Sequence, residues 1–597
     1  MDGPTKSYYP DGKIKNEINY TNDNEDGTYT SYYNSGGKYL YGEFKNGKRQ
    51  SLWTTYFEDG TVSQKTLYQD NEITGEFTEY FQNGKLSTKG TYYKKKVDGK
   101  LENYDDDGKK YAEYLYEKGK LREVNFYDKA GNIISTTTTR KGNANIIFYN
   151  PDGFKISEGY FTKDGYKDGK FISYFNSGKI SQESNWKNGT QDGLQADYYP
   201  DNKLKKTTNY KDGNEDGYIK DFHPNGNLNS EGWKVNGQKQ QHLLYYNNIG
   251  DLVTKEYYLN DELSGYSEYF DPGNRQSIEY FYTNGWLNTL TQFDSTGKVM
   301  SLNKFDKGNG QFIYKNSNGK NSSVGNYTNY MLNGSNTYYF FDGSVSSIIF
   351  YKNDLRDSIN KSYYYGGALK SEGKFKAGVK DGTWKYYFPN GKIKEEETYV
   401  DGNQQGFDKI YLADGSLDKV ITYKNNQLEG SYDIYGEKGQ LAVRFNFKAD
   451  IIKSYQYEEK PGVMISPIPL KGAIGKVIAK YPNGKQSTLL NYMDNEQQGE
   501  RKIFYSNGNI YSDGYRLNGY LHGSLKSYYP NGKIWKEENY VLGNLNGVCK
   551  SYYPNGKIEK EENFYNDENH GLNKYYDEQG KLKQTFTYYH GSLLSVK

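Results

Sequence analysis

The chain has 597 residues, a net charge of +2 and a mean hydropathy of −1.03. Its 77 basic and 75 acidic residues balance, which argues against the basic groove that nucleic acid requires. No apolar run approaches the roughly 18 residues of a membrane-spanning helix, so neither a transmembrane segment nor a signal peptide is expected in this sequence.

A 24-residue unit repeats through the chain and is clearest at residues 382–405, GTWKYYFPNGKIKEEETYVDGNQQ. It reads as strand, tight turn, strand and connector, because Asn-Gly and Asp-Gly between β-prone runs predict a two-residue hairpin turn with φ > 0 at both positions. The turn glycines keep a spacing of 24 at 343, 367, 391, 415 and 439, and again at 484, 508, 532, 556 and 580. A fixed period of this length indicates a repeat architecture. Asn202 replaces one turn glycine, which is tolerable because Asn visits the left-handed region.

The order along the chain predicts one continuous array of about 24–25 units. Its parts are regular repeats at 1–129, hairpin repeats at 130–272, degenerate repeats at 273–342, regular repeats at 343–457, a Pro-rich degenerate hairpin or hinge at 458–476, and regular repeats at 477–597. In the degenerate part, Gly273, Gly297 and Gly319 keep approximate phase. At ~4.8 Å between strands the array would extend roughly 240 Å if straight, and sheet twist shortens this.

The predicted register pairs opposite charges across each hairpin. A two-residue turn at Asn531-Gly532 places Tyr529 opposite Ile534 and Lys526 opposite Glu537, and the same arithmetic pairs Lys385 with Glu396 and Lys550 with Glu561. On the other face, Gly90, Gly42 and Gly232 oppose Phe77, Tyr29 and Ile219, so that the large side chain covers bare backbone. Glutamates occupy this glycine position in other units, at Glu397, Glu538 and Glu562, and the pattern gives no reason for them.

Composition favours an all-β, elongated, single-layer antiparallel hairpin array, twisted or superhelical, without a deep core. Only 34% of residues are hydrophobic, yet 17% are aromatic and 68 are Tyr, whose stems pack while their hydroxyls stay hydrated. The one cysteine, Cys549, cannot form an intramolecular disulfide. The compartment stays open between an extracytoplasmic or cell-surface location, if an N-terminal signal has been removed, and the cytoplasm.

Three units carry a family resemblance: residues 382–399, GTWKYYFPNGKIKEEETY; residues 523–540, GSLKSYYPNGKIWKEENY; and residues 75–93, GEFTEYFQNGKLSTKGTYY. They resemble the variant MORN repeat and look like bacterial repeat proteins of the YwqK-type antitoxin group. The resemblance covers nearly the whole chain and implies a single-layer hairpin sheet with a scaffold or binding role and no enzymatic activity. The sequence departs from the usual MORN pattern in its few tryptophans and many Tyr-Tyr pairs.

No catalytic constellation, metal site or cofactor site is expected. None of the five histidines has a second ligand at metal spacing, and Cys549 occupies the packed position of Trp384 and Leu525 in the unit. The acidic run 23–26 could attract calcium but lacks the EF-hand spacing, so a solvated connector is favoured. The basic run 94–96 is interpreted as a solvated edge rather than a phosphate site.

The favoured function is a non-enzymatic scaffold that binds protein partners through an extended β surface. Its candidate interaction residues are aromatic or apolar: Trp384, Tyr387, Tyr528, Trp535, Tyr552, Val463, Met464 and Ile465. The alternatives are a surface or secreted adhesin-like module that binds glycan through exposed tyrosines, and a neutraliser of a cognate toxin. The edge of the first strand offers a further route, self-association by strand pairing.

Overall fold

The computed structural model describes residues 2–9, 12–271, 274–294, 296–316, 318–436 and 439–597. The predicted turn glycine Gly273 lies outside these residues. The chain forms two compact units, Met1–Gln195 and Ala196–Lys597. No described segment is a helix long and apolar enough to cross a membrane.

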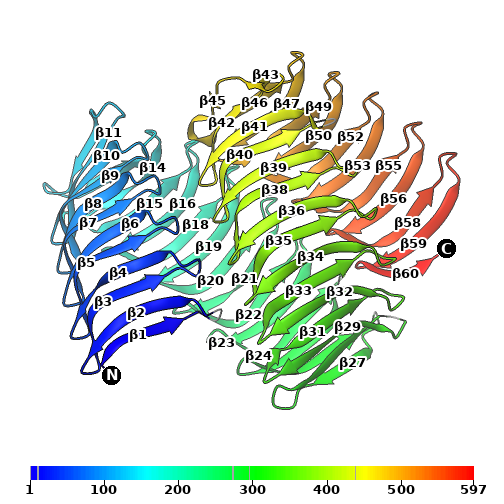
Figure 1. Ribbon diagram of the computed structural model, residues 1–597, viewed down its shortest axis with the longest axis horizontal. Coiled ribbons are helices and arrows are strands. Elements are labelled where there is room, and N and C mark those ends of the chain that lie inside the picture. The colour runs from blue at the N-terminus through cyan, green and yellow to red at the C-terminus, as the bar shows by residue number, and fades with distance from the viewer. Residues whose placement is uncertain (1, 10–11, 272–273, 295, 317, 437–438) are drawn as a thin grey trace. The chain divides into compact units, whose positions relative to one another are not determined.

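The strands form four large antiparallel sheets in which neighbours follow chain order, confirming an all-β hairpin array. Figure 1 shows the strands of each sheet side by side in this order. The sheets run from β1 (Gly3–Tyr8) to β12 (Ile133–Thr138), from β13 (Ala144–Tyr149) to β27 (Val299–Lys304), from β28 (Gly310–Lys315) to β45 (Ile468–Pro469), and from β46 (Gly475–Lys480) to β60 (Ser592–Val596).

The turn at Pro389-Asn390-Gly391 has three residues, so the predicted two-residue turn is wrong. It joins β35 (Val379–Tyr387) to β36 (Ile393–Val400). The Phe388 N–H donates to the Lys392 carbonyl at 2.8 Å and closes the turn. Only Gly391 has positive φ, 82°. This is the type I turn followed by a left-handed residue that characterises three-residue hairpins.

The connector is where the two-residue turn lies. Asn425 and Asn426 both have positive φ, 51° and 66°, and they join β39 (Leu417–Lys424) to β40 (Gln427–Tyr435) with Lys424 paired to Gln427. Positive φ at both central residues defines the type I′ hairpin. Each unit therefore contains two alternating hairpin turns, and the sheet continues without a crossover.

The predicted charge pairs are confirmed. Lys526, Lys385 and Lys550 oppose Glu537, Glu396 and Glu561, with N···O distances of 3.3, 3.4 and 3.3 Å. Near the turn the prediction is wrong, since Tyr528 rather than Tyr529 opposes Ile534. The extra loop residue shifts the register by one, and the bulge between Ser527 and Tyr528 shifts it back.

The glycines Gly90, Gly42 and Gly232 do oppose Phe77, Tyr29 and Ile219. The covering side chain, however, often comes from the next strand instead of the predicted partner. A Cβ added at Gly42 would first meet Trp53, and one added at Gly232 would first meet Leu243. A large side chain of the following hairpin thus packs on the bare backbone of the glycine, and this contact holds successive units together.

The Tyr-Tyr pairs also join neighbouring units. The second tyrosine donates to a carbonyl 23 residues later, as Tyr364 does to Tyr387 and Tyr529 to Tyr552, at 2.7 and 2.6 Å. The first tyrosine donates to a glutamate 15 residues earlier, as Tyr552 does to Glu537 at 2.7 Å. Each hairpin is therefore bonded both backwards and forwards along the array.

The large sheets are interrupted at three places, which we call corners. The same type of backbone hydrogen bond occurs at each corner. The N–H groups of Thr139, Phe305 and Leu470 each donate to the carbonyl 17 residues earlier, at 3.0, 3.0 and 2.8 Å. All three side chains are buried. The expected lack of a core is wrong here, because a small core lies at each corner, with Phe126 and Ile146 at the first, Leu290 and Phe312 at the second, and Phe445 and Val477 at the third.

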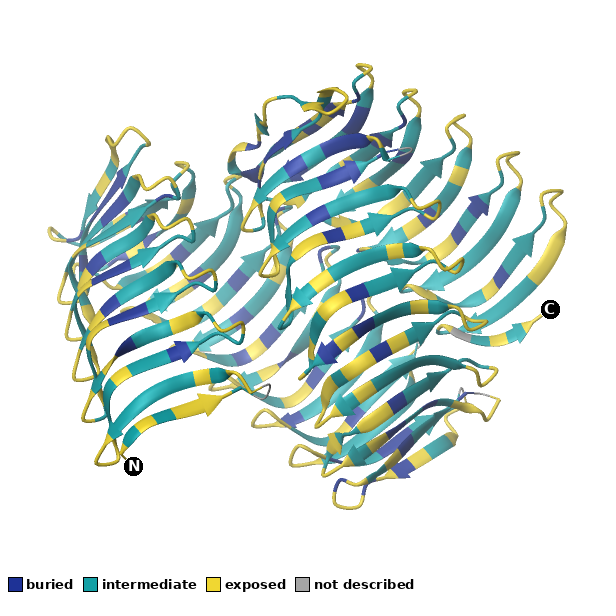
Figure 2. Ribbon diagram, in the orientation of Figure 1, coloured by how far each residue is buried: buried dark blue, intermediate teal, exposed yellow. Residues whose placement is uncertain are grey.

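The segment 458–476 contains the third corner. A side hairpin of β43 (Glu458–Lys460) and β44 (Val463–Met464) leaves the large sheet, β45 rejoins it by pairing with β42 (Ile451–Gln456), and a 3₁₀ turn follows at Lys471–Ala473. Figure 2 shows exposed residues gathered in the turns and buried ones along the strands.

Candidate functional site

The predicted interaction residues lie on four separate hairpins. Trp384 is buried, covers Gly373 and donates through Nε1 to the Lys374 carbonyl at 3.1 Å. Tyr387 and Tyr552 belong to the ties between units, and the half-buried Tyr528 supplies the carbonyl that accepts from Tyr505. These tyrosines and Trp384 thus have structural contacts of their own.

The remaining predicted residues are more accessible. Trp535 is 38% exposed and lies beside the Tyr529 ring, with centroids 6.2 Å apart. Val463 is exposed on the side hairpin, while Met464 and Ile465 are half-buried. The Ile465 N–H donates to the Tyr457 carbonyl at 3.0 Å, which extends the pairing of this hairpin by one position.

A more extended aromatic surface lies on three consecutive hairpins of the unit Ala196–Lys597. Three cross-strand ring pairs form it, and we call them the aromatic stripe: Tyr218–Trp233, His242–Tyr257 and Tyr266–Phe281, with centroids 6.1, 5.2 and 4.9 Å apart. The strands are β20 (Asn214–Phe222), β21 (Leu228–Val235), β22 (Gln238–Tyr246), β23 (Leu252–Leu259), β24 (Glu262–Asp271) and β25 (Arg275–Thr283).

The stripe is accessible although its strands are firmly packed. Tyr218, Trp233 and Tyr266 are 38%, 39% and 53% exposed, whereas Ile219 and Leu243, which point to the other face, are buried. Its sequence signal is an aromatic side chain recurring every 24 residues, at 218, 242 and 266. Sequence reasoning missed it because it weighted the Tyr-Tyr and Trp positions near the predicted turns.

Hydrogen bonds fix the orientation of the stripe's first ring. The Tyr218 hydroxyl donates to Glu231 at 2.6 Å, and the Lys220 ammonium lies 5.3 Å from the ring centroid. Burial and this bond to Glu231 raise the pKa of Tyr218 to about 12. The ring therefore stays neutral at physiological pH and presents a fixed aromatic edge.

Within the same unit, segments more than 290 residues apart in the sequence lie in contact. Tyr589 donates to Asp271 at 2.7 Å, the Asn247 amide donates to the Tyr565 hydroxyl at 2.8 Å, and Asn248 donates to the Val541 carbonyl at 2.7 Å. These bonds bring C-terminal hairpins against the strands that carry the stripe.

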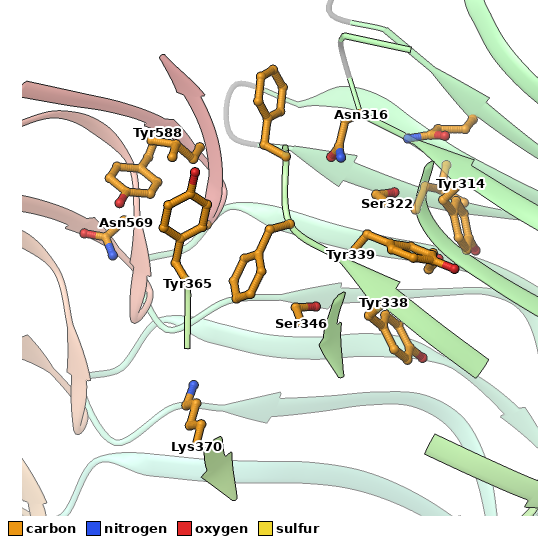
Figure 3. A pocket seen from close by; sticks show the side chains of 17 residues that line it. Tyr314, Asn316, Ser322, Tyr338, Tyr339, Ser346, Tyr365, Lys370, Asn569 and Tyr588 are labelled. Atoms are coloured by element: carbon orange, nitrogen blue, oxygen red, sulfur yellow. The ribbon is translucent and has the colours of Figure 1, made fainter. Parts of the chain in front are cut away.

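A cavity of about 760 Å³ lies close to this contact. Figure 3 shows Tyr365 and Tyr588 on one side and Tyr314, Tyr338 and Tyr339 on the other. Ser322, Ser346, Asn316, Asn569 and Lys370 add hydroxyl, amide and ammonium groups to its lining. The volume falls in the range of small-molecule sites, and the lining offers aromatic faces with hydrogen-bonding groups between them.

The acidic and thiol groups have distinct environments. Among the described residues, only Glu395, Glu397 and Asp408 bring three carboxylate ligands together, with ligand oxygens within 4.8 Å of one another.

Burial raises the pKa of the Cys549 thiol. A buried thiol with a raised pKa is a poor nucleophile, consistent with a packing role.

The glutamates that the sequence left unexplained are paired. Glu397 accepts from Lys380 Nζ at 2.8 Å and from the Tyr386 hydroxyl at 3.1 Å. Glu562 accepts from Lys560 at 2.7 Å, and Glu538 accepts from Lys536. Each of these three glutamates is thus compensated by a lysine.

Comparison with known proteins identifies the repeat. The sequence model described as "MORN repeat variant" matches nine segments: residues 1–22, 73–95, 167–188, 191–212, 380–401, 497–518, 521–541, 545–567 and 569–588. The protein is a MORN-repeat protein. Each match covers one strand–turn–strand hairpin, as residues 380–401 cover β35, its three-residue turn and β36.

We also compared this MORN-repeat protein with curated proteins and with solved structures. No curated protein matches it. The crystal structure titled TcdB2-TccC3-Cdc42 aligns at 10% identity over 98% of this chain and 35% of that one, with a TM-score of 0.20. The Tc holotoxin pore of Photorhabdus luminescens aligns at 12% identity over 99% and 32%, with a TM-score of 0.15. The protein spans about a third of the length of those chains.

Proposed function

We propose that this MORN-repeat protein is a non-enzymatic scaffold that binds a protein partner through the aromatic stripe. The observation that carries the proposal is the exposure of aromatic rings on three consecutive hairpins whose other face is packed, namely Tyr218, Trp233, His242 and Tyr266. Repeat arrays commonly present such continuous surfaces to other proteins.

The energetics favour aromatic side chains at the centre of an interface. Tyr and Trp are enriched among residues whose truncation costs at least about 2 kcal/mol of binding energy. The six strands of the stripe extend over roughly 24 Å, which is enough for the centre of an interface of about 800 Å² per partner. The ring pairs are already in contact, so little side-chain entropy is lost on binding.

The test is affinity capture from the native host with three forms of the full chain. One is the natural sequence, one carries Tyr218→Ser, Trp233→Ser and Tyr266→Ser, and the control carries Val548→Ser and Leu572→Ser, which are exposed aliphatic positions on other hairpins. We expect partners that the natural and control forms retain and the triple variant loses. Equal capture by all three forms would refute the proposal.

A second candidate function, glycan binding, is supported by the tyrosine-lined cavity. Aromatic faces stack on sugar rings, and the surrounding Ser, Asn and Lys groups could bond sugar hydroxyls. A glycan array probed with the natural chain and with Tyr365→Ala tests this, because Tyr365 lines the cavity and is exposed. We expect hits that the variant weakens, and an array without hits removes this candidate.

A further inference from the structure

Three carboxylates converge on the inner face of one hairpin junction. Glu395 and Glu397 lie on β36, two residues apart and therefore on the same face. On β38 (Gly406–Tyr411), Ile410 and Lys409 pair with Glu395 and Glu396, and Asp408 is the next residue along that strand. Their ligand oxygens all lie within 4.8 Å of one another. Like charges that face each other across a sheet destabilise it unless something compensates them.

Only part of this charge has a partner. Lys380 Nζ lies 2.8 Å from Glu397 and compensates that carboxylate. Asp408 is 5% exposed, and its Oδ1 atom has no hydrogen-bond partner among the described residues. A buried carboxylate oxygen without a partner is costly, so a ligand at this point would relieve an existing penalty.

We propose that Glu395, Glu397 and Asp408 bind a divalent cation of the calcium class. The donors are all carboxylate oxygens, which suit hard cations. Oxygens that share one Ca²⁺ lie at most about twice the 2.3–2.6 Å metal–oxygen distance apart, and these three meet that limit. Ca²⁺ also accepts irregular geometry and completes its shell with water, whereas Mg²⁺ demands shorter distances and an octahedron.

Equivalent positions elsewhere in the chain lack this arrangement. Cys549 takes the strand position that Asp408 has in its own repeat, and it opposes Glu562, while Glu538 opposes Leu525 on the preceding strand. Each of these two glutamates pairs with a lysine of its own strand, Lys536 or Lys560. Asp408 therefore distinguishes this junction from the others. Glu538 and Glu562, which lack such a neighbouring acid, supply matched control positions.

A proton competes with the cation for the same oxygens. Burial, together with Glu395 and Glu397, raises the pKa of Asp408 to about 7, and Lys394, Lys380 and Lys419 are cationic groups that face this cluster. Cation binding should therefore strengthen as the pH rises from 6 to 8, since Asp408 loses its proton over that range.

The experiment uses the full chain, stripped of metal with a chelator, and titrates Ca²⁺ alone by calorimetry at pH 6 and pH 8. Terbium luminescence gives a second readout, because Tb³⁺ replaces Ca²⁺ and Trp384, which opposes Glu397, can sensitise it. The variants are Asp408→Asn and, as the control, Glu538→Gln. We expect saturable Ca²⁺ binding that is tighter at pH 8, at least tenfold weaker in Asp408→Asn, and unchanged in Glu538→Gln.

Two results would overturn the proposal. One is the lack of saturable binding of either ion by the natural chain at pH 8. The other is equal binding by the natural chain and Asp408→Asn, which would place the ion elsewhere. Circular dichroism of each variant in the absence of metal shows whether the strands remain folded, and Glu395→Gln provides a second test of the same oxygens if Asp408→Asn fails to fold.

Discussion

Single tyrosine hydroxyls carry the bonds between neighbouring repeats. Tyr529 donates to the Tyr552 carbonyl, while the Tyr552 hydroxyl donates to Glu537. At Tyr528 the residue 15 positions earlier is Asp513, which is one methylene shorter than glutamate, and the Tyr528 hydroxyl makes no hydrogen bond to a described residue. Two adjacent tyrosines thus differ in what their hydroxyls contribute.

We expect Tyr529→Phe to lower the local stability of its hairpin by about 1 kcal/mol, the net value of one hydrogen bond. Hydrogen exchange of peptides that cover β52 (Gly523–Tyr528) and β55 (Gly547–Tyr552) measures this as faster opening. Tyr528→Phe is the control and should leave exchange unchanged. Equal effects of both variants would contradict the assigned tie.

Asp408 makes a residue-scale prediction about pH. Its folded-state pKa of about 7 lies above the usual value of 3.8, so the folded state binds more protons between these values and stability falls as the pH rises through this window. Without divalent cations, Asp408→Asn should stabilise the protein at pH 8, by at most about 4 kcal/mol, and have little effect at pH 4. Thermal unfolding at both pH values checks this, and destabilisation at pH 8 would contradict it.

At the scale of the element, the two turn types account for the 24-residue period. The three-residue turn needs a left-handed residue only at its last position, where Gly391 has φ of 82° and Asn202 has φ of 69° in another repeat. The type I′ connector needs two such residues and commonly contains Asn, Asp or Gly. The repeat pattern predicted the strands of the hairpins correctly, but the two-residue turn that it placed at Asn-Gly lies at the connector.

The turn predicts a specific pair of substitutions. Gly391→Ala should destabilise the β35–β36 hairpin by about 1 kcal/mol, because no atom lies near the added Cβ and the whole cost is backbone conformation. Gly391→Asn should cost less, as Asn202 indicates. Local hydrogen exchange across 379–400 measures both, and a reversed order would refute the turn assignment.

The period-24 pattern was sufficient to predict the hairpins, their charge pairs and the MORN resemblance. It did not reveal the corners, because the signal there has a longer spacing: Thr139, Phe305 and Leu470 lie 166 and 165 residues apart. It also did not reveal the acidic cluster, since Asp408 and Glu395 become neighbours only through cross-strand register. The aromatic residues of the stripe recur every 24 residues in the sequence, but only the structure shows that they are exposed while other aromatic residues of the repeat are packed.

At the scale of the molecule, the unit Ala196–Lys597 is held by bonds between distant hairpins as well as by the sheet. Tyr565 and Tyr589 donate to Asp251 and Asp271 respectively. Burial and the hydrogen bond to Asp251 raise the pKa of Tyr565, so its hydroxyl remains a donor over the physiological range. These contacts adjoin the strands of the stripe and support their position.

The double variant Tyr565→Phe and Tyr589→Phe should therefore loosen two separated segments together. We expect faster hydrogen exchange at 244–275 and at 541–591, with little change elsewhere in the unit. Tyr553→Phe, which removes only a bond to the next repeat, should affect its neighbours alone. A change confined to 541–591 in the double variant would mean that the distant contact contributes nothing.

The central claim is that the protein acts as a scaffold through its aromatic stripe. The most direct measurement is hydrogen exchange of the full chain with and without a captured partner. The account predicts protection concentrated in β20 to β25, residues 214–283, and its loss in the Tyr218, Trp233 and Tyr266 variant. Protection elsewhere, with 214–283 unchanged, would contradict the claim.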